Sequence, residues 1–84
     1  MTNNEILKKK IIYRSIHRGS KEMDMLLGEF VKKYIDKLND NELDQLEKLL
    51  SVEDEIIYNW YFKNINNNKI FVNKVSTRLK KFRL

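Results

Sequence analysis

Residues 17–38 read HRGSKEMDMLLGEFVKKYIDKL, and this stretch decides the fold. From about Ser20 onward its large apolar residues recur at the spacing of one helical face, which predicts an amphipathic helix packed against a core; they are Met23, Leu26, Leu27, Phe30, Tyr34 and Leu38. Gly28 lies inside this helix, where glycine costs about 1 kcal/mol relative to alanine. We therefore expect a neighbouring element to pack closely against Gly28.

Four further helices are expected around this one. A first helix precedes it, and Asn39 with Glu42 forms a capping box that opens a third. Ser51 with Asp54 repeats that pattern and opens a short fourth. The Asn-rich stretch 64–68 is expected to be a loop, because asparagine competes for backbone hydrogen bonds. The expected helices run from about Asn4 to His17, Ser20 to Leu38, Asn39 to Leu50, Ser51 to Tyr61 and Lys69 to Lys81.

Several apolar residues are expected to face the core from these flanking helices. The first helix offers Leu7 and Ile11, with Tyr13 and Ile16 beside them. The third and fourth offer Leu43, Leu46, Leu49, Leu50, Ile56, Ile57, Trp60 and Tyr61, and the last offers Phe71, Val72, Val75, Leu79 and Phe82. The basic tail, about residues 78–84, is expected to fray. Residues 1–84 are thus predicted to form one all-α domain, a bundle of about five helices.

The composition agrees with a small helical domain and narrows its chemistry. The chain has 84 residues, no proline and no cysteine, and is 42% apolar and 35% charged. The lack of cysteine excludes disulfides and thiolate metal sites. No apolar run is long enough to span a membrane, and no signal-peptide core is visible at the N-terminus. With no transit peptide recognised either, the expected compartment is the bacterial cytoplasm, and the free protein is expected to be a monomer.

Charge is distributed in three blocks. Residues 1–21 carry a net +5, residues 22–60 a net −7 and residues 61–84 a net +7. Such a pattern favours basic ends that fold against an acidic middle. It weakens the alternative hypothesis, a small basic nucleic-acid-binding module, because such modules more often present a basic face without so acidic a centre.

The sequence offers little material for catalysis. His17 is the only histidine, and no set of ligands at a recognisable metal-binding spacing accompanies it. No nucleophile, oxyanion hole or glycine-rich phosphate loop is apparent. We therefore expect a protein that is not itself an enzyme, with no catalytic residue, no metal and no stably bound cofactor.

The charged joint at residues 17–24 allows two interpretations. In the first, Arg18 complements the C-terminal end of the first helix, Gly19 adopts the left-handed conformation that ends it, and Glu22 forms a capping box or pairs with Arg18. In the second, Gly19 lets a partner's backbone approach. Arg18 and Glu22 then stand exposed side by side as a recognition pair. Both can hold together.

Two motifs in the chain resemble those of a known family. Arg18, Gly19 and Glu22 match RGxxE, followed by an acidic residue at Asp24 and a leucine-rich helix. The acidic stretch 53–55 leads into Tyr58-Asn59-Trp60. In these features residues 6–62 resemble the FAD assembly factors of succinate dehydrogenase, the SdhE/YgfY family, called succinate dehydrogenase assembly factor 2 in mitochondria.

The resemblance implies a function and a site. Members are small helical bundles without enzymatic activity that bind the flavoprotein subunit of succinate dehydrogenase, and in some bacteria fumarate reductase. They promote covalent attachment of FAD to that subunit. The implied partner-binding residues are His17, Arg18, Gly19, Glu22 and Asp24. The chain would bind no FAD stably itself and would act on FAD attachment in its partner.

The chain departs from the family pattern at three places. His17 stands where many members have a second arginine, Glu55 stands where a proline is common, and the basic tail matches no family motif. Trp60 is expected to be a core anchor rather than a binding residue, since Ile56 and Ile57 accompany it at helical spacing. For Asn59 two roles stay open: it could fix the loop through polar contacts, or it could contact a partner.

Overall fold

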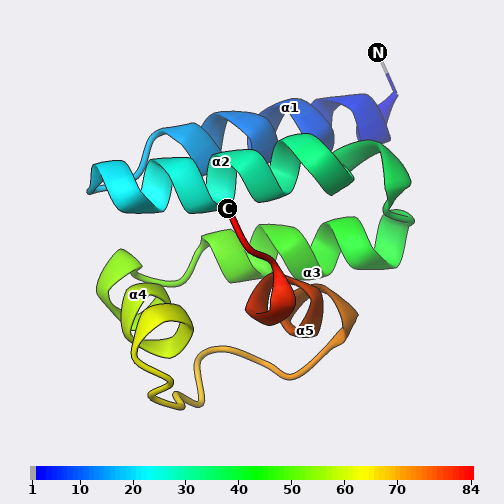
Figure 1. The fold of residues 1–84 in the computed structure, drawn as a ribbon. Helices are drawn as coiled ribbons and strands as arrows, with labels where there is room; N and C mark the ends of the chain where they lie inside the picture. The colour runs from blue at the N-terminus through cyan, green and yellow to red at the C-terminus, as the bar shows by residue number, and fades with distance from the viewer. Residues whose placement is uncertain (1) are drawn as a thin grey trace.

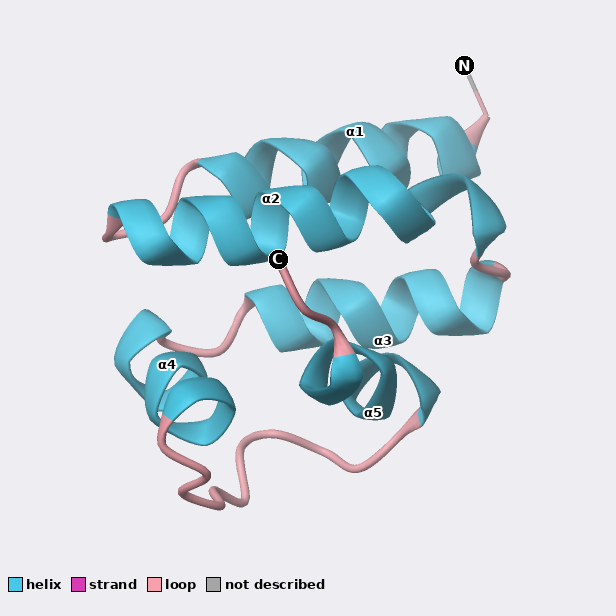
Figure 2. Cartoon of the chain, in the orientation of Figure 1, coloured by secondary structure: helices cyan, strands magenta, loops and turns pink. Residues whose placement is uncertain are grey.

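The computed structural model describes residues 2–84, and the described part contains helices and loops but no strand. Five α-helices follow one another along the chain, with one turn of 3₁₀-helix, η1, after the second (Figures 1 and 2). Their bounds are α1 Asn3–Ile16, α2 Lys21–Tyr34, η1 Ile35–Lys37, α3 Asp40–Leu50, α4 Asp54–Phe62 and α5 Lys74–Lys81. The predicted all-α fold is confirmed.

The helices form two layers. α1 and α2 lie antiparallel as one layer, and α3 runs back beneath them, with the shorter α4 and α5 on its far side (Figure 1). α2 contributes most to the core between the layers: its predicted stripe is buried except for Tyr34, which is partly buried against the same cluster. The other helices complete the core with Ile11, Leu43, Leu46, Leu50, Ile57, Val75 and Leu79, each at most 2% exposed.

Gly28 permits the close contact between α1 and α2. A Cβ atom at this position would lie 3.2 Å from Cγ2 of Ile16, which is tighter than ordinary packing. The expectation of a neighbour packed against Gly28 is thus confirmed. Ile16 and Tyr13 remain more than half exposed, so the apolar side of α1 faces the core through Ile11 and, in part, Leu7.

Several helix boundaries differ from the sequence-based prediction. The second helix ends as α-helix at Tyr34 and only its 3₁₀ turn continues towards Leu38. Ser51 does not open α4; it terminates α3, where its hydroxyl donates to the carbonyl of Glu47. The N-cap of α4 is Glu53, whose side chain makes no capping hydrogen bond. The capping box of Asn39 and Glu42 is confirmed.

The last helix is shorter than predicted. It begins at Lys74, because the side chains of Asn73 and Ser76 form a capping box with each other's backbone N–H groups. Phe71 and Val72 therefore lie in the preceding loop and are 66% and 94% exposed instead of facing the core. In the tail the ring of Phe82 packs edge-on against Phe30, with centroids 5.4 Å apart, on the core side as predicted.

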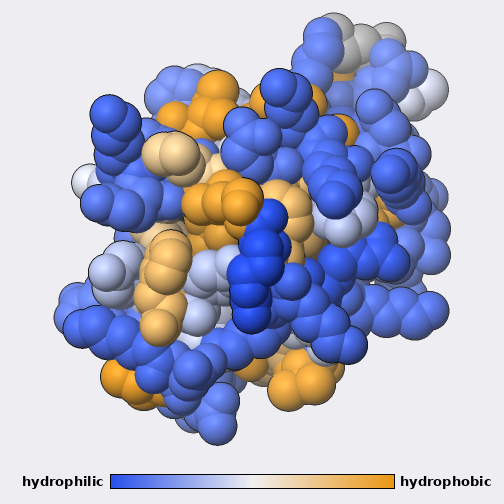
Figure 3. Space-filling view, viewed as in Figure 1, coloured by the Kyte–Doolittle hydropathy of each residue, from blue (hydrophilic) through white to orange (hydrophobic). Residues whose placement is uncertain are grey.

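The basic N-terminal block pairs with the acidic middle as predicted, whereas within residues 2–84 only Lys69 of the C-terminal block forms an ion pair. Lys10 and Arg14 on α1 reach Glu47 on α3, and Lys69 in the last loop reaches Glu53. Hydrophilic side chains cover most of the face seen in Figure 3, with separate apolar patches between them. None of the helices in the described part is long and apolar enough to cross a bilayer.

Candidate partner-binding site

The side chain of Arg18 points into the protein rather than towards solvent. It is 9% exposed, and it fills the space between the α1–α2 joint and the end of α3. Its guanidinium donates to the carbonyl oxygens of Leu50, at 2.7 Å, and Val52, at 3.1 Å. A cation here satisfies carbonyl groups left over at the C-terminal end of α3 and complements the negative end of that helix.

Asp54 joins the two sequence motifs. One of its carboxylate oxygens accepts from Nε of Arg18 at 2.7 Å and lies 2.6 Å from Nη2, while the other accepts from the backbone N–H of Gly19. Asp24 adds a further tie by accepting from the backbone N–H of Arg18 at 2.6 Å. The RGxxE joint and the acidic start of α4, 36 residues apart at Arg18 and Asp54, are therefore one hydrogen-bonded unit.

The glycine at position 19 is explained by the close approach of the Asp54 carboxylate and not by an unusual backbone angle. Neither glycine has a positive φ, so the expected left-handed helix end is wrong. A Cβ atom at Gly19 would lie 2.9 Å from Oδ2 of Asp54, so a side chain here would force the Asp54 carboxylate to shift. The Asp54 carboxylate occupies the place that a partner's backbone was expected to take.

Glu22 stands apart from this hydrogen-bonded unit. Ser20 caps α2 by accepting from the N–H of Met23, so Glu22 is not the residue of a capping box. Glu22 is exposed and makes no ion pair with Arg18 or with any other cation in residues 2–84. The exposed pair of the Arg18 guanidinium and the Glu22 carboxylate that the sequence suggested is not formed, because the guanidinium is bound to Asp54.

An open groove lies beside the joint. It has a volume of about 480 Å³ and is lined by Gly19, Ser20, Glu22, Met23, Asp54, Glu55 and Tyr58. Glu22 and Glu55 are exposed at this groove, and Tyr58 is half-buried. We call it the joint groove. Its chemistry is two carboxylates beside an aromatic ring, which favours a cationic or hydrogen-bond-donating group from another molecule.

The remaining predicted residues have distinct surroundings. His17 is exposed at the end of α1, where its ring stacks on that of Tyr13 with centroids 3.9 Å apart and Nδ1 lies 2.8 Å from the Tyr13 carbonyl oxygen. Asp24 serves the joint through the hydrogen bond described above. Of the five predicted residues, Glu22 and Gly19 line the joint groove, whereas Arg18 and Asp24 hold its wall in place.

Sequence reasoning missed the role of Asp54 and the participation of Tyr58 in the groove. Both lie within the second motif, so the recurrence of the two motifs together was the available signal. Trp60 is partly buried against the core, in keeping with its predicted role as an anchor. The carbonyl of Asn59 accepts from the N–H groups of Lys63 and Ile65, which ties the end of α4 to the loop. Within residues 2–84 no three His, Asp or Glu side chains are grouped as metal ligands.

Comparison with known proteins identifies the family. The sequence model of the family described as flavinator of succinate dehydrogenase matches residues 9–83. The chain belongs to this family. The match includes both motifs and the helices that bring them together, and it gives no support to the alternative of a nucleic-acid-binding module.

The similar curated proteins are mitochondrial assembly factors. Succinate dehydrogenase assembly factor 2, mitochondrial, of Meyerozyma guilliermondii is 43% identical over 60 residues, which cover 71% of this chain and 44% of that protein. Its counterpart in Saccharomyces cerevisiae is 39% identical over 71 residues, covering 82% and 44%. That of Dictyostelium discoideum is 42% identical over 66 residues, covering 73% and 47%.

Two facts follow from these relatives. The chain spans less than half the length of the curated relatives it matches. Their names also contradict the expected bacterial cytoplasm, since the relatives from yeasts and Dictyostelium are mitochondrial. The expectation was wrong because it rested on failing to recognise a targeting segment, and an unrecognised signal says little about a compartment. The relatives are named as assembly factors, which agrees with the expectation that the chain is not an enzyme.

Proposed function

We propose that this protein binds the flavoprotein subunit of succinate dehydrogenase and promotes the covalent attachment of FAD to that subunit. The family description supports the action on succinate dehydrogenase. The single structural observation that supports a docking role is the joint groove, where the two family motifs meet around Asp54 and Glu22 and Glu55 are exposed, with no ion pair to another residue in 2–84.

Two sets of residues at the joint have different roles in this proposal: one holds the helices in place and the other is exposed at the groove. Arg18, Asp24 and Asp54 satisfy one another and the end of α3, so they fix the position of α4 relative to α2. Glu22, Glu55 and Tyr58 then form a surface held by rigid elements, which costs little ordering on binding. In this proposal a lysine or arginine of the flavoprotein enters the groove between the two carboxylates.

The chemistry of attachment belongs to the flavoprotein and its FAD. A bound factor can speed such a reaction by holding the partner in the geometry in which FAD and the accepting side chain meet, which removes an orientational cost from the barrier. This chain needs no catalytic residue for that role. In this proposal FAD is the partner's cofactor, and fumarate reductase is a second client to be tested in the same assay.

Reconstitution tests the proposed function. The purified apo-flavoprotein is incubated with FAD, with and without this chain, and then run on a denaturing gel on which only covalently bound flavin fluoresces. The proposal expects fluorescence to appear faster, or only, with the chain present. Equal rates with and without a folded chain, over a range of concentrations at which complex formation is measured, would contradict it.

A further inference from the structure

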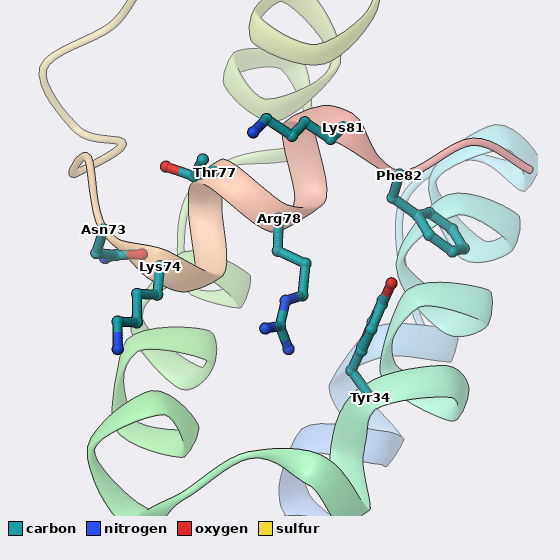
Figure 4. Close-up of a pocket in the computed structure, with 7 residues that line it drawn as sticks. All are labelled: Tyr34, Asn73, Lys74, Thr77, Arg78, Lys81 and Phe82. Atoms are coloured by element: carbon teal, nitrogen blue, oxygen red, sulfur yellow. The ribbon is translucent and has the colours of Figure 1, made fainter.

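A cationic hollow lies far from the joint groove, where α5 meets the end of α2. It has a volume of about 590 Å³ and is lined by Lys74, Arg78 and Lys81 of α5, with Tyr34 and Phe82 as its aromatic wall and with Asn73 and Thr77 completing it (Figure 4). In Figure 4 the side chain of Arg78 extends from α5 towards the side on which Tyr34 lies, Lys74 extends beside it from the start of α5, and the amine of Lys81 extends away from Tyr34. None of the described residues that line the hollow is acidic.

Further cations gather on the same aromatic ring. The guanidinium carbon of Arg78 lies 5.0 Å from the centroid of Tyr34, and the Nζ atoms of Lys33 and Lys37 lie 5.6 Å and 5.8 Å from it. The ring offsets part of the repulsion among these charges, since its face is electron-rich. We call the five residues Lys33, Lys37, Lys74, Arg78 and Lys81 the basic cluster.

The basic cluster has no carboxylate partner within residues 2–84, although six other cations of the chain are ion-paired there. No member makes an ion pair within residues 2–84, and Asp36, the acid beside Lys37 in sequence, pairs instead with Lys8. On α1, by contrast, Lys10 and Arg14 reach Glu47. Charges closer than about 10 Å are screened only partly at ordinary salt. Lys33, Lys37 and Arg78, which share the Tyr34 ring, therefore repel one another, and an anion from outside would relieve that repulsion.

We propose that the basic cluster is a second docking surface that receives an acidic segment of the partner protein. This inference rests on the proposed function, since it assigns a second contact to the same partner. An acidic protein segment fits better than a nucleic acid. The proposed partner is a protein, and the family match gives no support to nucleic-acid binding.

The position of the basic cluster would let this second contact orient the partner. The joint groove lies at the start of α2 and the basic cluster at its end, so the 14-residue helix separates them by about 20 Å. One surface is acidic and the other basic. A partner with complementary charges can therefore bind in only one direction, and charge complementarity of this kind sets orientation and association rate more than final affinity.

Binding kinetics with neutralised variants test the inference. Association of the chain with the flavoprotein subunit is followed at increasing salt for the wild type, for Lys74→Gln with Arg78→Gln, and for Lys37→Gln with Lys74→Gln. The second pair leaves the Arg78–Tyr34 contact intact. The matched control is Lys9→Gln with Lys48→Gln, two exposed lysines outside the cluster.

Each outcome bears on the inference. We expect both pairs of cluster substitutions to slow association about tenfold at low salt, which is more than the control pair slows it. Their association rates should converge on the wild-type rate as salt screens the charges. Cluster variants that associate at the control rate would overturn the inference. If the cluster variants associate at the control rate but Glu22→Ala abolishes binding to the flavoprotein, the proposed function stands and only the second docking surface is overturned. A wild-type chain that never binds the flavoprotein contradicts both the second docking surface and the proposed function.

Model ligands identify the class of partner. Amide NMR spectra are recorded with a deca-glutamate peptide, with a short DNA duplex and with inorganic pyrophosphate at equal charge concentration. The inference expects the peptide to shift the signals of Tyr34 and residues 74–81 in the wild type and not in the cluster variants. Tighter binding of the duplex, or saturation of the cluster by pyrophosphate alone, would overturn it.

Discussion

At the scale of single residues, Arg18 shows how a motif can be recognised and its role misjudged. The motif at Arg18, Gly19 and Glu22 was visible in the sequence, and so was the acidic stretch that contains Asp54. The inward orientation of the Arg18 side chain could not be predicted from the sequence. Two of its acceptors are the backbone carbonyls of Leu50 and Val52, and carbonyls have no sequence signature. Side-chain type predicts a charged contact but not which side of the surface it lies on.

Removing either side chain of the Arg18–Asp54 pair should destabilise the fold. Arg18→Ala leaves a largely buried carboxylate without its partner and is expected to lower the free energy of unfolding by about 2–4 kcal/mol. Asp54→Ala should cost a similar amount. Urea denaturation of both variants and of the double variant measures the coupling, which we expect at about 1–3 kcal/mol. Additive losses would show that the pair does not act as a unit.

Gly19→Ala should weaken the same unit for a steric reason. The added methyl would meet the Asp54 carboxylate at 2.9 Å, so the hydrogen bond from the residue-19 N–H must lengthen or break. We expect a loss of about 1–2 kcal/mol in the free energy of unfolding. Ser20→Gly provides a neighbouring comparison, since glycine replaces serine at an N-cap at a cost of only a few tenths of a kcal/mol. A neutral Gly19→Ala would contradict the close-approach explanation.

At the scale of elements, periodicity predicted the long helices well and the short ones poorly. The stripe of α2 and the capping box of α3 follow from local rules that the structure obeys. The start of α5 does not: Phe71 and Val72 continue its apolar spacing, yet Asn73 and Ser76 cap each other and begin the helix later. Two local signals competed there, and sequence spacing alone does not rank them. Ser51 is a similar case, since it ends α3 rather than capping α4.

The late start of α5 can be tested at its cap. Asn73→Ala removes the side-chain acceptor for the Ser76 N–H and should cost about 1 kcal/mol in the free energy of unfolding. Phe71→Ser, in the preceding loop, should change that free energy by less than about 0.5 kcal/mol because the ring is mostly exposed. Circular dichroism with urea denaturation measures both. A larger loss for Phe71→Ser than for Asn73→Ala would favour the longer helix.

Lys80 on α5 links stability to alkaline pH. Burial, with a smaller contribution from nearby Arg83, lowers the pKa of Lys80 below its ordinary 10.5. The folded protein therefore releases this proton before the unfolded chain does, and between the two pKa values stability rises with pH. Lys80→Gln should remove that part of the slope in urea denaturation. An NMR titration of the Lys80 side-chain carbons that gives a pKa at or above 10.5 would contradict it.

At the scale of the whole molecule, the charge blocks predicted how the chain folds back on itself. The basic N-terminal segment pairs with acids of the middle, at Glu47 and Asp54, and the acidic middle also draws in Lys69. The pattern could not show that the cations around α5 stay unpaired, since that depends on the packing of α5 against α3 and the end of α2. Net charge by segment thus predicted the fold's internal complementarity better than its remaining surface.

The whole molecule is best described as a rigid support for the joint groove. Arg18, Asp54 and the core hold α2 and α4, and the groove between them presents Glu22 and Glu55. The central claim is that these two carboxylates bind the partner without contributing to the fold. A variant of the groove should then lose function at unchanged stability, whereas a variant of Arg18 or Asp54 should lose both.

The most direct measurement is the rate of covalent flavin attachment with Glu22→Ala and Glu55→Ala combined, alongside Glu29→Ala as control. Glu29 is an exposed carboxylate two turns further along α2 and outside the groove. The double variant should keep a urea midpoint close to that of the wild type, because each first-turn carboxylate stabilises its helix by only about 0.3–1 kcal/mol. It should nevertheless lose at least about tenfold in rate, corresponding to about 1.4 kcal/mol. Glu29→Ala should retain the wild-type rate. A folded double variant that attaches flavin as fast as the wild type would contradict the account.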